Sequence, residues 1–355
     1  MELRVLNTNF VDQLILEVSS SLIWTERYFG FGDFEIYTPV DIFSYLLLSE
    51  DNYLTLKDSD YLMIIESREI KTLNEEGDYL LVKGRSAESI LDRRIVWGQT
   101  RLYGNFQEAI YHLLCEAFIE PDDNDRLVSN FIFEESTDEA ITSLTIDTQV
   151  MAENLYTVIQ SLCAVRSIGF KITLTPDNKF KFKLYSGVDR SYDQTDNTCV
   201  VFSDKFNNLI SSDHISNKTN MKTIALVLGP GEGAERTGAV AVAPEGAGTG
   251  LNRREMYSDG SSVSEEVDGV IITPEDFLIQ LIEVGDASLV ENIWYEAFHG
   301  KVDPEGTFKY GRDFGLGDIV QLANKYGDEG RARVTEFIRS QDPSGTSVYP
   351  TFSTI

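Results

Sequence analysis

Hydrophobic and polar residues alternate through residues 51–85 in a way that predicts three β-strands. Turn-forming clusters around Asp58 and Gly77 separate the strand-like runs. Short alternating runs bounded by Gly, Asn, Asp and Ser are typical of an antiparallel meander. We therefore expect this stretch to form part of a small β-structure.

A second stretch, residues 317–354, carries a similar pattern. Gly345 matches Gly77, and residues 334–336 match residues 64–66. Any antiparallel meander produces comparable spacing, so the pattern alone leaves open whether the two stretches are copies of one unit. If they are copies, the chain contains two small barrels to which the other segments are attached.

The segment before the first meander predicts further strands. Aromatic-rich runs flank Gly30 and Gly32, which favours a hairpin, and Asp41 begins a short helix or loop. After the meander, we expect the hydroxyl of Ser86 to accept a hydrogen bond from the first turn of a short helix and so to cap it. We assign residues 1–98 to a first β-barrel domain.

Residues 99–190 have a different pattern. Apolar residues recur at three- and four-residue spacing after Asn105 and again after Asn154, which predicts two amphipathic helices. An irregular stretch up to Val150 is expected between them, and alternation at 170–184 predicts a hairpin. These elements form an α+β lateral domain.

Residues 191–300 are expected to hold connecting strands, a Gly/Ala-rich loop or extended hairpin at 229–250, and a long helix at 273–299. Pro at the first helical position followed by acidic residues favours the start of that helix. Gly285 in its middle costs about 1 kcal/mol relative to Ala, which indicates a kink or close packing there.

Residues 301–355 are expected to complete a second β-barrel domain with strands from 191–228. The predicted fold class is therefore α+β and β-rich, with two small antiparallel β-barrels and inserted α+β lateral domains. A chain of 355 residues with 42% hydrophobic and 25% charged residues fits a soluble protein of two to four domains.

Charge narrows the choice of partner. The 30 basic and 58 acidic residues give a net charge of −28, which disfavours specific binding of nucleic acid or of an anionic membrane. The acidity serves either simple solubility or a wall along which a polyanion slides without sticking. No apolar run approaches the roughly 20 residues that span a bilayer, and the first residues lack the layout of a signal peptide. We expect synthesis in a cytoplasm and no stable membrane association.

Groups for catalysis are scarce. Adjacent carboxylates suit glycoside hydrolysis in principle, but neighbours on a strand point to opposite faces, and the aspartates lack the Gly and Glu of a calcium loop. The candidate pairs are Glu134 with Glu135, Glu265 with Glu266, and Asp122 with Asp123. No Ser or Cys motif accompanies a histidine, and the cysteines are few and widely spaced. These residues are His112, His214, His299, Cys115, Cys163 and Cys199. We expect no catalytic residue, cofactor or metal site.

Two further motifs have ordinary explanations. Gly229, Gly231 and Ala234 match part of a dinucleotide fingerprint, but no helix pattern comes after them, so a loop is favoured. Lysines on one face of the predicted 170–184 hairpin serve solubility and edge protection, or else a docking patch for an acidic partner. They are Lys171, Lys179, Lys181 and Lys183.

Several segments, in order along nearly the whole chain, resemble the tail-hub proteins of siphophages. This family, also called baseplate-hub, tail-associated or Tal-like proteins, is related in architecture to the hub protein of contractile tails. The segments that carry the resemblance are 21–28, 32–36, 84–98, 131–136, 169–172, 187–192 and 348–352. Residues 229–250 match least well.

The resemblance implies a non-enzymatic structural protein of a phage tail tip. It implies two tube domains per chain and a trimeric ring that adapts a six-fold tail tube to a three-fold tip and lets DNA pass during ejection. It also implies a place in the virion and, as partners, the distal tail protein, the tape-measure protein, and receptor-binding or tail-fibre proteins. The alternatives are a glycan-degrading enzyme that uses Glu134 or a host-receptor-binding protein. Because the chain ends at Ile355, we expect no cell-wall-degrading extension.

Overall fold

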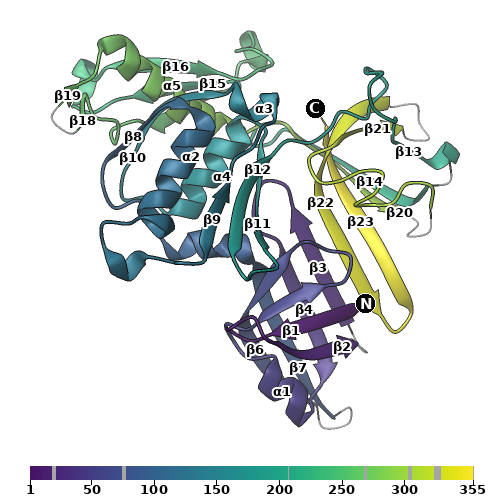
Figure 1. Ribbon diagram of the computed structural model, residues 1–355. Helices are drawn as coiled ribbons and strands as arrows, with labels where there is room; N and C mark the ends of the chain where they lie inside the picture. Colours follow the sequence, from purple (N-terminus) through teal and green to yellow (C-terminus); the bar gives the residue numbers. More distant parts are fainter. Residues whose placement is uncertain are drawn as a thin grey trace.

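The computed structural model describes residues 1–17, 21–73, 77–206, 208–267, 270–302, 306–323 and 329–354. Most of the two turns expected at 74–77 and 325–330 lies outside these residues. Figure 1 shows a large sheet through the lower and right-hand parts of the molecule, with most of the helices and the smaller sheets grouped at the upper left.

Within the described ranges, thirteen strands form one large mixed sheet. Its main path runs β14-β20-β23-β22-β3-β4-β7-β6-β5-β1-β2, with β21 beside β22 and β13 beside β21. The strands of the first half are β1 (Glu2–Leu6), β2 (Asp12–Glu17), β3 (Ser21–Arg27), β4 (Asp33–Pro39), β5 (Tyr53–Leu56), β6 (Leu62–Leu73) and β7 (Gly77–Ser86). Those of the second half are β13 (Val201–Ser203), β14 (Leu209–Asn217), β20 (Tyr295–Val302), β21 (Ile319–Ala323), β22 (Glu329–Asp342) and β23 (Gly345–Thr354).

This architecture confirms a β-rich α+β fold. In the described part of the chain, however, β14 and β2 lie at opposite ends of the strand order and do not pair, so the sheet is open. The two separate closed barrels that we expected are therefore not confirmed. The two halves are instead continuous through the pairing of β22 with β3.

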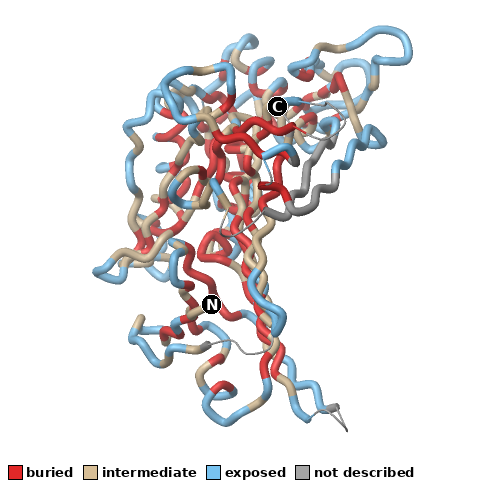
Figure 2. Tube along the Cα trace, turned by 90° about the vertical axis from the view of Figure 1, so that its right-hand side faces the viewer, coloured by how far each residue is buried: buried red, intermediate tan, exposed pale blue. Residues whose placement is uncertain are grey.

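One face of the large sheet is covered by its own outer strands and loops. Trp24, Phe34 and Val82 point from the central strands into a core that also holds Leu3 of β1 and Phe314 of the segment before β21. Each of these side chains is at most 3% exposed. Alternation along the strands leaves their other side chains on the opposite face. Figure 2 shows the buried stretches concentrated in the upper body and exposed residues toward the lower end.

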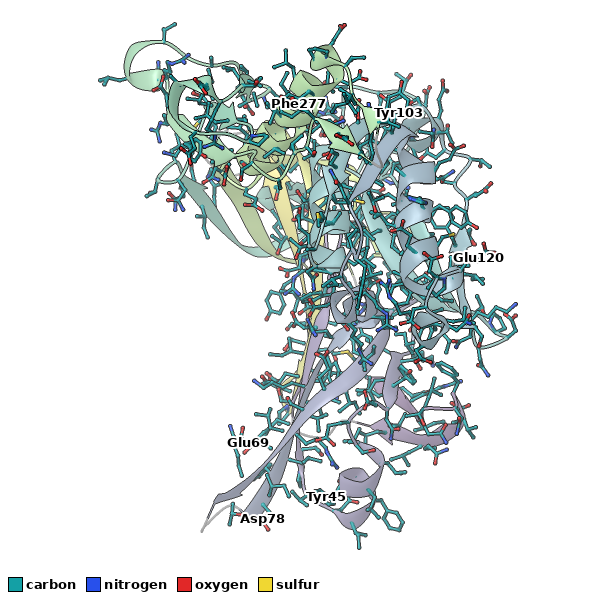
Figure 3. The ribbon with its side chains drawn as sticks, turned by 90° about the vertical axis from the view of Figure 1, so that its left-hand side faces the viewer. Tyr45, Glu69, Asp78, Tyr103, Glu120 and Phe277 are labelled. Atoms are coloured by element: carbon teal, nitrogen blue, oxygen red, sulfur yellow. The ribbon has the colours of Figure 1, made fainter. Side chains whose placement is uncertain are left out.

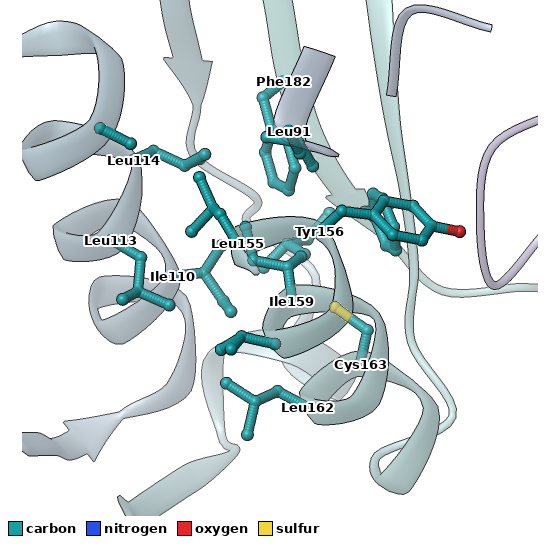
Figure 4. Close-up of a cluster of buried hydrophobic side chains, with 14 of the residues drawn as sticks. Leu91, Ile110, Leu113, Leu114, Leu155, Tyr156, Ile159, Leu162, Cys163 and Phe182 are labelled. Atoms are coloured by element: carbon teal, nitrogen blue, oxygen red, sulfur yellow. The ribbon is translucent and has the colours of Figure 1, made fainter. Parts of the chain in front are cut away.

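An α+β segment, residues 99–190, which we continue to call the lateral domain, comes after β7 and a 3₁₀ helix (Ala87–Arg93). It contains β8 (Thr100–Asn105), α2 (Phe106–Leu114), β9 (Phe131–Glu134), α3 (Glu139–Thr142), β10 (Thr145–Val150), α4 (Leu155–Val165), β11 (Gly169–Leu174) and β12 (Phe180–Tyr185). Asn105 and Asn154, after which the helical spacing begins, cap α2 and α4 with their side chains. Figure 4 shows Ile110, Leu113 and Ile159 packed between these two helices.

Two local predictions in this region are wrong. The stretch before Val150 is not irregular, because β10 pairs with β8 and β9 pairs in parallel with β12. Ser86 does not cap the 3₁₀ helix after it. Its hydroxyl instead accepts a hydrogen bond from the amide of Gly32 at 2.7 Å, which fixes the β3–β4 turn to the end of β7.

A small unit is inserted between β14 and β20. Its elements are β15 (Ile224–Leu228), β16 (Gly238–Val242), β17 (Glu255–Asp259), the hairpin of β18 (Glu266–Val267) and β19 (Val270–Ile271), and α5 (Pro274–Val290). The Gly/Ala-rich region is thus an extended hairpin, since β16 pairs with β15. A Cβ atom at Gly285 would lie 2.5 Å from the Cβ of Ala241, so the glycine allows close packing of α5 on the sheet.

The expected helix at 273–299 is too long. α5 ends at Val290, and the chain continues as β20, which carries the backbone of His299. The apolar spacing around residues 293–298 is compatible with both periods over so short a run. Pairing of β20 with β14 on one side and β23 on the other decides for a strand.

Candidate assembly surface

The large sheet contains the same five-strand arrangement twice. The first repeat is β3, β4, β7, β6 and β5, and the second repeat is β14, β20, β23, β22 and β21, each in that spatial order. Every neighbouring pair within both repeats is antiparallel. The meander similarity seen in the sequence therefore extends to two strands that the sequence pattern did not include.

The two repeats also agree in register. Across the first repeat, the row of paired residues is Trp24, Phe34, Gly84 and Ile65. Across the second repeat, the corresponding row is His214, Phe298, Phe352 and Val334. A β-bulge comes directly afterwards in both, after Ile65 in β6 and after Val334 in β22.

The bulges correct the alignment made from the sequence. Residues 334–336 correspond to residues 65–67 and not to 64–66, whereas Gly77 and Gly345 do correspond, since each begins the last strand of its repeat. The extra residue of a bulge is invisible in an alternating pattern, so an error of one position is expected from the sequence.

The two repeats join at a seam, which we call the internal seam. Residues 336–341 of β22 pair antiparallel with residues 22–27 of β3. Glu26, only 2% exposed, lies on the core side of this seam and forms an ion pair with Arg339. The hydroxyl of Ser59 donates a hydrogen bond to the same carboxylate at 2.6 Å, and the Trp24 indole does so at 3.2 Å. The buried charge is thus fully compensated, as a charge in the core must be.

The segment between β20 and β21 closes the internal seam. Tyr310 stacks on Phe337 of β22 with ring centroids 3.7 Å apart, and its hydroxyl donates to Glu26 at 2.8 Å. Burial and the nearby Glu26 carboxylate raise the pKa of Tyr310, so the phenol remains a donor. Phe314 packs edge-on against Phe202 at 5.2 Å and belongs to the shared core.

Sequence reasoning missed Glu26 and Arg339. A usable signal was present for Glu26, because it comes after Leu22 and Trp24 at spacing two and so falls on the apolar face of a predicted strand. An acid at such a position requires a partner. The identity of that partner, more than 300 positions away in the chain, is not encoded in any local pattern.

Each repeat has one edge that no other described strand covers. β6 pairs with β5 only through residues 62–64, which leaves residues 67–72 without a strand on that side. In the second repeat, β14 pairs only with β20 in the described part of the chain. These two stretches correspond to the two strands of the internal seam. Residues 67–72 have the same position in the first repeat as residues 336–341 in the second, and β14 has the same position in the second repeat as β3 in the first. Unpaired strand edges are templates for pairing with another chain.

The candidate carboxylates do not form a catalytic pair. Glu134 forms an ion pair with Lys181, Glu266 is exposed on β18, and Asp123 accepts a hydrogen bond from the amide of Asp125 at 3.0 Å. They therefore lie in separate parts of the fold. Within the described ranges, no three His, Cys, Asp or Glu side chains are grouped so as to hold a metal ion.

The other candidates are equally dispersed. His112 lies on the surface of α2, 3.3 Å from Glu116, whereas His214 and His299 lie on the neighbouring strands β14 and β20. The glycines after β15 lead into the hairpin and not into a long helix, and Arg236 holds that turn by donating to the carbonyl of Leu228 at 2.7 Å. This geometry does not fit a dinucleotide site.

The lysine face is largely paired within the chain. Lys171 lies 3.4 Å from Asp60, Lys179 lies 2.8 Å from Asp177, and Lys181 contacts Glu134. Burial and then the neighbouring Lys171 ammonium lower the pKa of Lys183. These contacts favour the edge-protection interpretation over a docking patch.

Comparison with known proteins identifies the family to which the chain belongs. The sequence model of the family described as "Siphovirus ReqiPepy6 Gp37-like protein" matches residues 2–352. The chain belongs to this family. The match confirms the resemblance to siphophage tail proteins that the sequence segments suggested. Among curated proteins, none matches the sequence.

Solved structures with a similar fold include three tail proteins, two of them from prophages. The tail protein from Neisseria meningitidis MC58 has a TM-score of 0.59 at 13% identity, covering 99% of this chain and 96% of that one. The 43 kDa tail protein of prophage MuSo2 from Shewanella oneidensis has a TM-score of 0.58 at 9% identity, with 99% and 98% covered. Prophage tail protein gp18 from Listeria monocytogenes EGD-e has a TM-score of 0.54 at 12% identity, with 99% and 94% covered. At these identities, the likeness establishes the fold alone.

The described helices add one observation about location. None of them combines the length and apolarity needed to cross a membrane.

Proposed function

We propose that this protein is a structural tail-tip hub, in which three chains form a ring of six repeats around a central opening. The observation that carries the proposal is the internal seam, because it shows how one repeat pairs with the next through β22 and β3. A ring of six such repeats built from three chains adapts a six-fold tube to a three-fold tip. The family match across residues 2–352 and the tail-protein fold support this role.

The proposed domain division is based on the repeats. Residues 1–98 contain the first tube domain, and residues 301–355 complete the second with β13 and β14. The unit at 99–190 lies beside the sheet, and the segment 191–300 carries the insertion. In the assembled ring, we place the lateral domain and the insertion at one end of the strands that pair between repeats, consistent with their place at the upper left of Figure 1.

The face of the sheet away from the core is proposed to line the bore. Several of its charged side chains are paired across strands: Lys83 with Glu35, and Arg27 with both Asp33 and Glu336. Such a wall has little net charge, so it offers a passing polyanion neither strong attraction nor strong repulsion. An acidic wall, one of the two roles that the sequence leaves open for the excess of carboxylates, receives no support from this face, and we propose that the carboxylates serve solubility.

The hub has no enzymatic role in this proposal. A glycan hydrolase acting through Glu134 requires a second carboxylate about 5–10 Å away across a substrate cleft. In the structure Glu134 is engaged by Lys181 on the surface of a small sheet. The distal tail protein, the tape-measure protein and receptor-binding or fibre proteins are proposed as neighbours in the virion, and DNA as a transient passenger.

Electron-microscopic class averages of the purified full chain test the proposal. We expect three-fold rings with a central hole, either in solution or in tail tips isolated from virions. A parallel assay on purified cell walls is expected to show no release of glycan fragments. Rings of another symmetry, or a chain that forms no ring in either setting, would overturn the proposed function.

A further inference from the structure

The most exposed apolar surface of the first repeat is the short helix α1 (Ile42–Leu47), which connects β4 to β5. Ile42, Phe43 and Leu46 are 68%, 70% and 62% exposed, respectively, and Ser44 is its one residue classed as buried. Asp41 caps the helix by accepting hydrogen bonds from the amides of Phe43 and Ser44, so the helix is a formed element. A rigid helix that presents its large apolar residues to solvent indicates a contact surface.

The second repeat shows what the equivalent segment does. The connection from β20 to β21 occupies the same place in its repeat as the connection that contains α1. There Tyr310 stacks on Phe337 of β22 and contacts Glu26 of β3, across the internal seam. The aromatic residues of that connection are thus part of the seam, where they cover the paired strands.

The first repeat has a contact equivalent to that of Tyr310 with Phe337 in the second repeat. Arg68 of β6 pairs with Val82 of β7, and Phe337 of β22 pairs with Pro350 of β23. Val82 and Pro350 occupy the same position in their repeats, so Arg68 corresponds to Phe337. The Arg68 guanidinium lies 5.1 Å from the ring centroid of Tyr45 on α1 and donates to the Tyr45 carbonyl oxygen at 2.7 Å. α1 therefore lies beside the open edge of β6 as the 306–316 segment lies beside the seam edge of β22.

The remaining half of this arrangement is absent from a single chain. In the internal seam, β3 covers the edge of β22, but no described strand covers residues 67–72 of β6. The corresponding strand of the second repeat, β14, presents Ile215 at 37% exposure next to exposed Ser216 and Asn217. Figure 1 places β14 at the right of the molecule and β6 at the lower left, so one chain cannot join them.

We infer that the exposed face of α1 and the outer edge of β6 form one interaction surface, whose partner is the edge strand β14 of a second copy of this chain. The inference rests on the proposed ring and specifies its interface between chains. β6 and β14 pair antiparallel in the register of the internal seam, which places Glu69 opposite Ile215 of the next copy, as Ile338 lies opposite Thr25. Ile42, Phe43 and Leu46 cover that pairing as Tyr310 covers the internal one.

Figure 3 shows the side chains concerned at one end of the molecule. Tyr45 of α1 and Glu69 of β6 lie there, remote from Tyr103 and Phe277 of the lateral domain and the insertion. The surface is therefore accessible to another chain without displacement of either of those units.

Cysteine cross-linking tests the register. The full-length Glu69→Cys variant is mixed with the full-length Ile215→Cys variant and gently oxidised. Because each chain carries one introduced thiol, only pairing between chains joins them, and we expect covalent dimers. Asn217→Cys is the matched control, because residue 217 lies on the same face of the strand but opposite Ser67. Residues 69 and 217 are then diagonal neighbours, about 7–8 Å apart, whereas direct partners are about 4.5–5.5 Å apart. We expect this control to cross-link less with Glu69→Cys. Each variant oxidised alone gives the background from Cys115, Cys163 and Cys199.

Loss of the apolar patch tests the role of α1. The triple variant Ile42→Ser, Phe43→Ser, Leu46→Ser removes exposed side chains, so folding measured by circular dichroism is expected to be unchanged. The protein concentration at half-assembly is expected to rise on the order of 100-fold, because large apolar residues at the centre of an interface dominate binding. The matched control is Leu251→Ser, Val270→Ser, Ile271→Ser, which removes side chains that are 99%, 65% and 78% exposed in the insertion and is expected to leave assembly unchanged.

The outcomes separate this inference from the proposed function. If the wild-type chain forms three-fold rings while Glu69→Cys and Ile215→Cys do not cross-link, or while the α1 variant assembles like the control, this interface is wrong and the hub proposal stands. If the wild-type chain forms no ring in solution or in isolated tail tips, the hub proposal fails and the interface fails with it.

Discussion

The internal seam and the open edge of β6 have the same backbone geometry but opposite surroundings. At the internal seam, β3 covers residues 336–341, and a buried carboxylate, a guanidinium and an aromatic stack complete the contact. At the edge of β6, residues 67–72 have no partner strand in the described part of the chain, and the apolar residues of α1 face solvent. A repeat that is satisfied on one side and open on the other is suited to forming a closed ring from identical chains.

The largest effect is expected from breaking the internal seam. Arg339→Ala leaves the Glu26 carboxylate buried without its cation, which typically costs about 3–5 kcal/mol of the free energy of unfolding. Urea denaturation monitored by tryptophan fluorescence measures the loss. Arg253→Ala is the control, because its partner Glu255 is 67% exposed and surface pairs contribute about 0–1 kcal/mol. Equal losses of the free energy of unfolding in the two variants would show that the Glu26–Arg339 ion pair at the seam contributes no more to stability than a surface ion pair.

The second effect concerns the connection between the first repeat and the lateral domain. The fully buried Glu88 carboxylate, just after β7, accepts a hydrogen bond from the amide of Ile172 in β11 at 2.7 Å. Burial raises the pKa of Glu88 to about 7. The folded state thus holds its proton more tightly than the unfolded state, so the free energy of unfolding falls as the pH rises from the unfolded pKa near 4.5 through 7.

Glu88→Gln keeps a carbonyl acceptor and removes the titration. We expect its free energy of unfolding to be flatter over that pH range and to exceed that of the wild type at pH 8 by roughly 1–3 kcal/mol. Chemical denaturation at several pH values measures the difference. If the free energies of unfolding of the two proteins change with pH in parallel, the Glu88 carboxyl group does not contribute to the pH dependence of stability.

The third effect concerns the insertion that interrupts the second repeat. A short turn joins β3 to β4, whereas the whole insertion separates β14 from β20. Gly285→Ala introduces a Cβ atom 2.5 Å from the Cβ of Ala241 and is expected to destabilise the insertion by about 1–3 kcal/mol. Hydrogen exchange resolved by segment is expected to show faster exchange in β15 and β16 and no change in β22. Gly98→Ala, which meets no atom within 4 Å, is the control. Faster exchange in β22 as well would show that the insertion and the seam are coupled.

Local pattern was sufficient for part of this structure. The two meanders, the β3–β4 hairpin and the capped helices α2 and α4 are explained by alternation, helical spacing and capping residues within short windows. The family resemblance also came from such segments. These features depend on residues that are neighbours in the sequence, which is where pattern is informative.

The candidate assembly surface depends on residues that are far apart in the sequence. β14 is a polar edge strand with Ser, Asp, His and Asn along it, so it lacks an apolar alternation. The short apolar run of β20 fits both the helical and the strand period, so the sequence predicts a helix there. The pairing of β22 with β3 joins opposite ends of the chain. Only the three-dimensional arrangement shows that five strands, and not three, are repeated.

The most direct test of the account is a chain that carries both Glu69→Cys and Ile215→Cys. After mild oxidation and denaturing electrophoresis, we expect a covalent ladder that ends at three chains, because three internal seams and three cross-linked seams close the ring. A ladder that continues to four chains or more, or the absence of cross-linked species from a preparation whose micrographs show rings, would contradict the claim that one seam geometry is used both within and between chains.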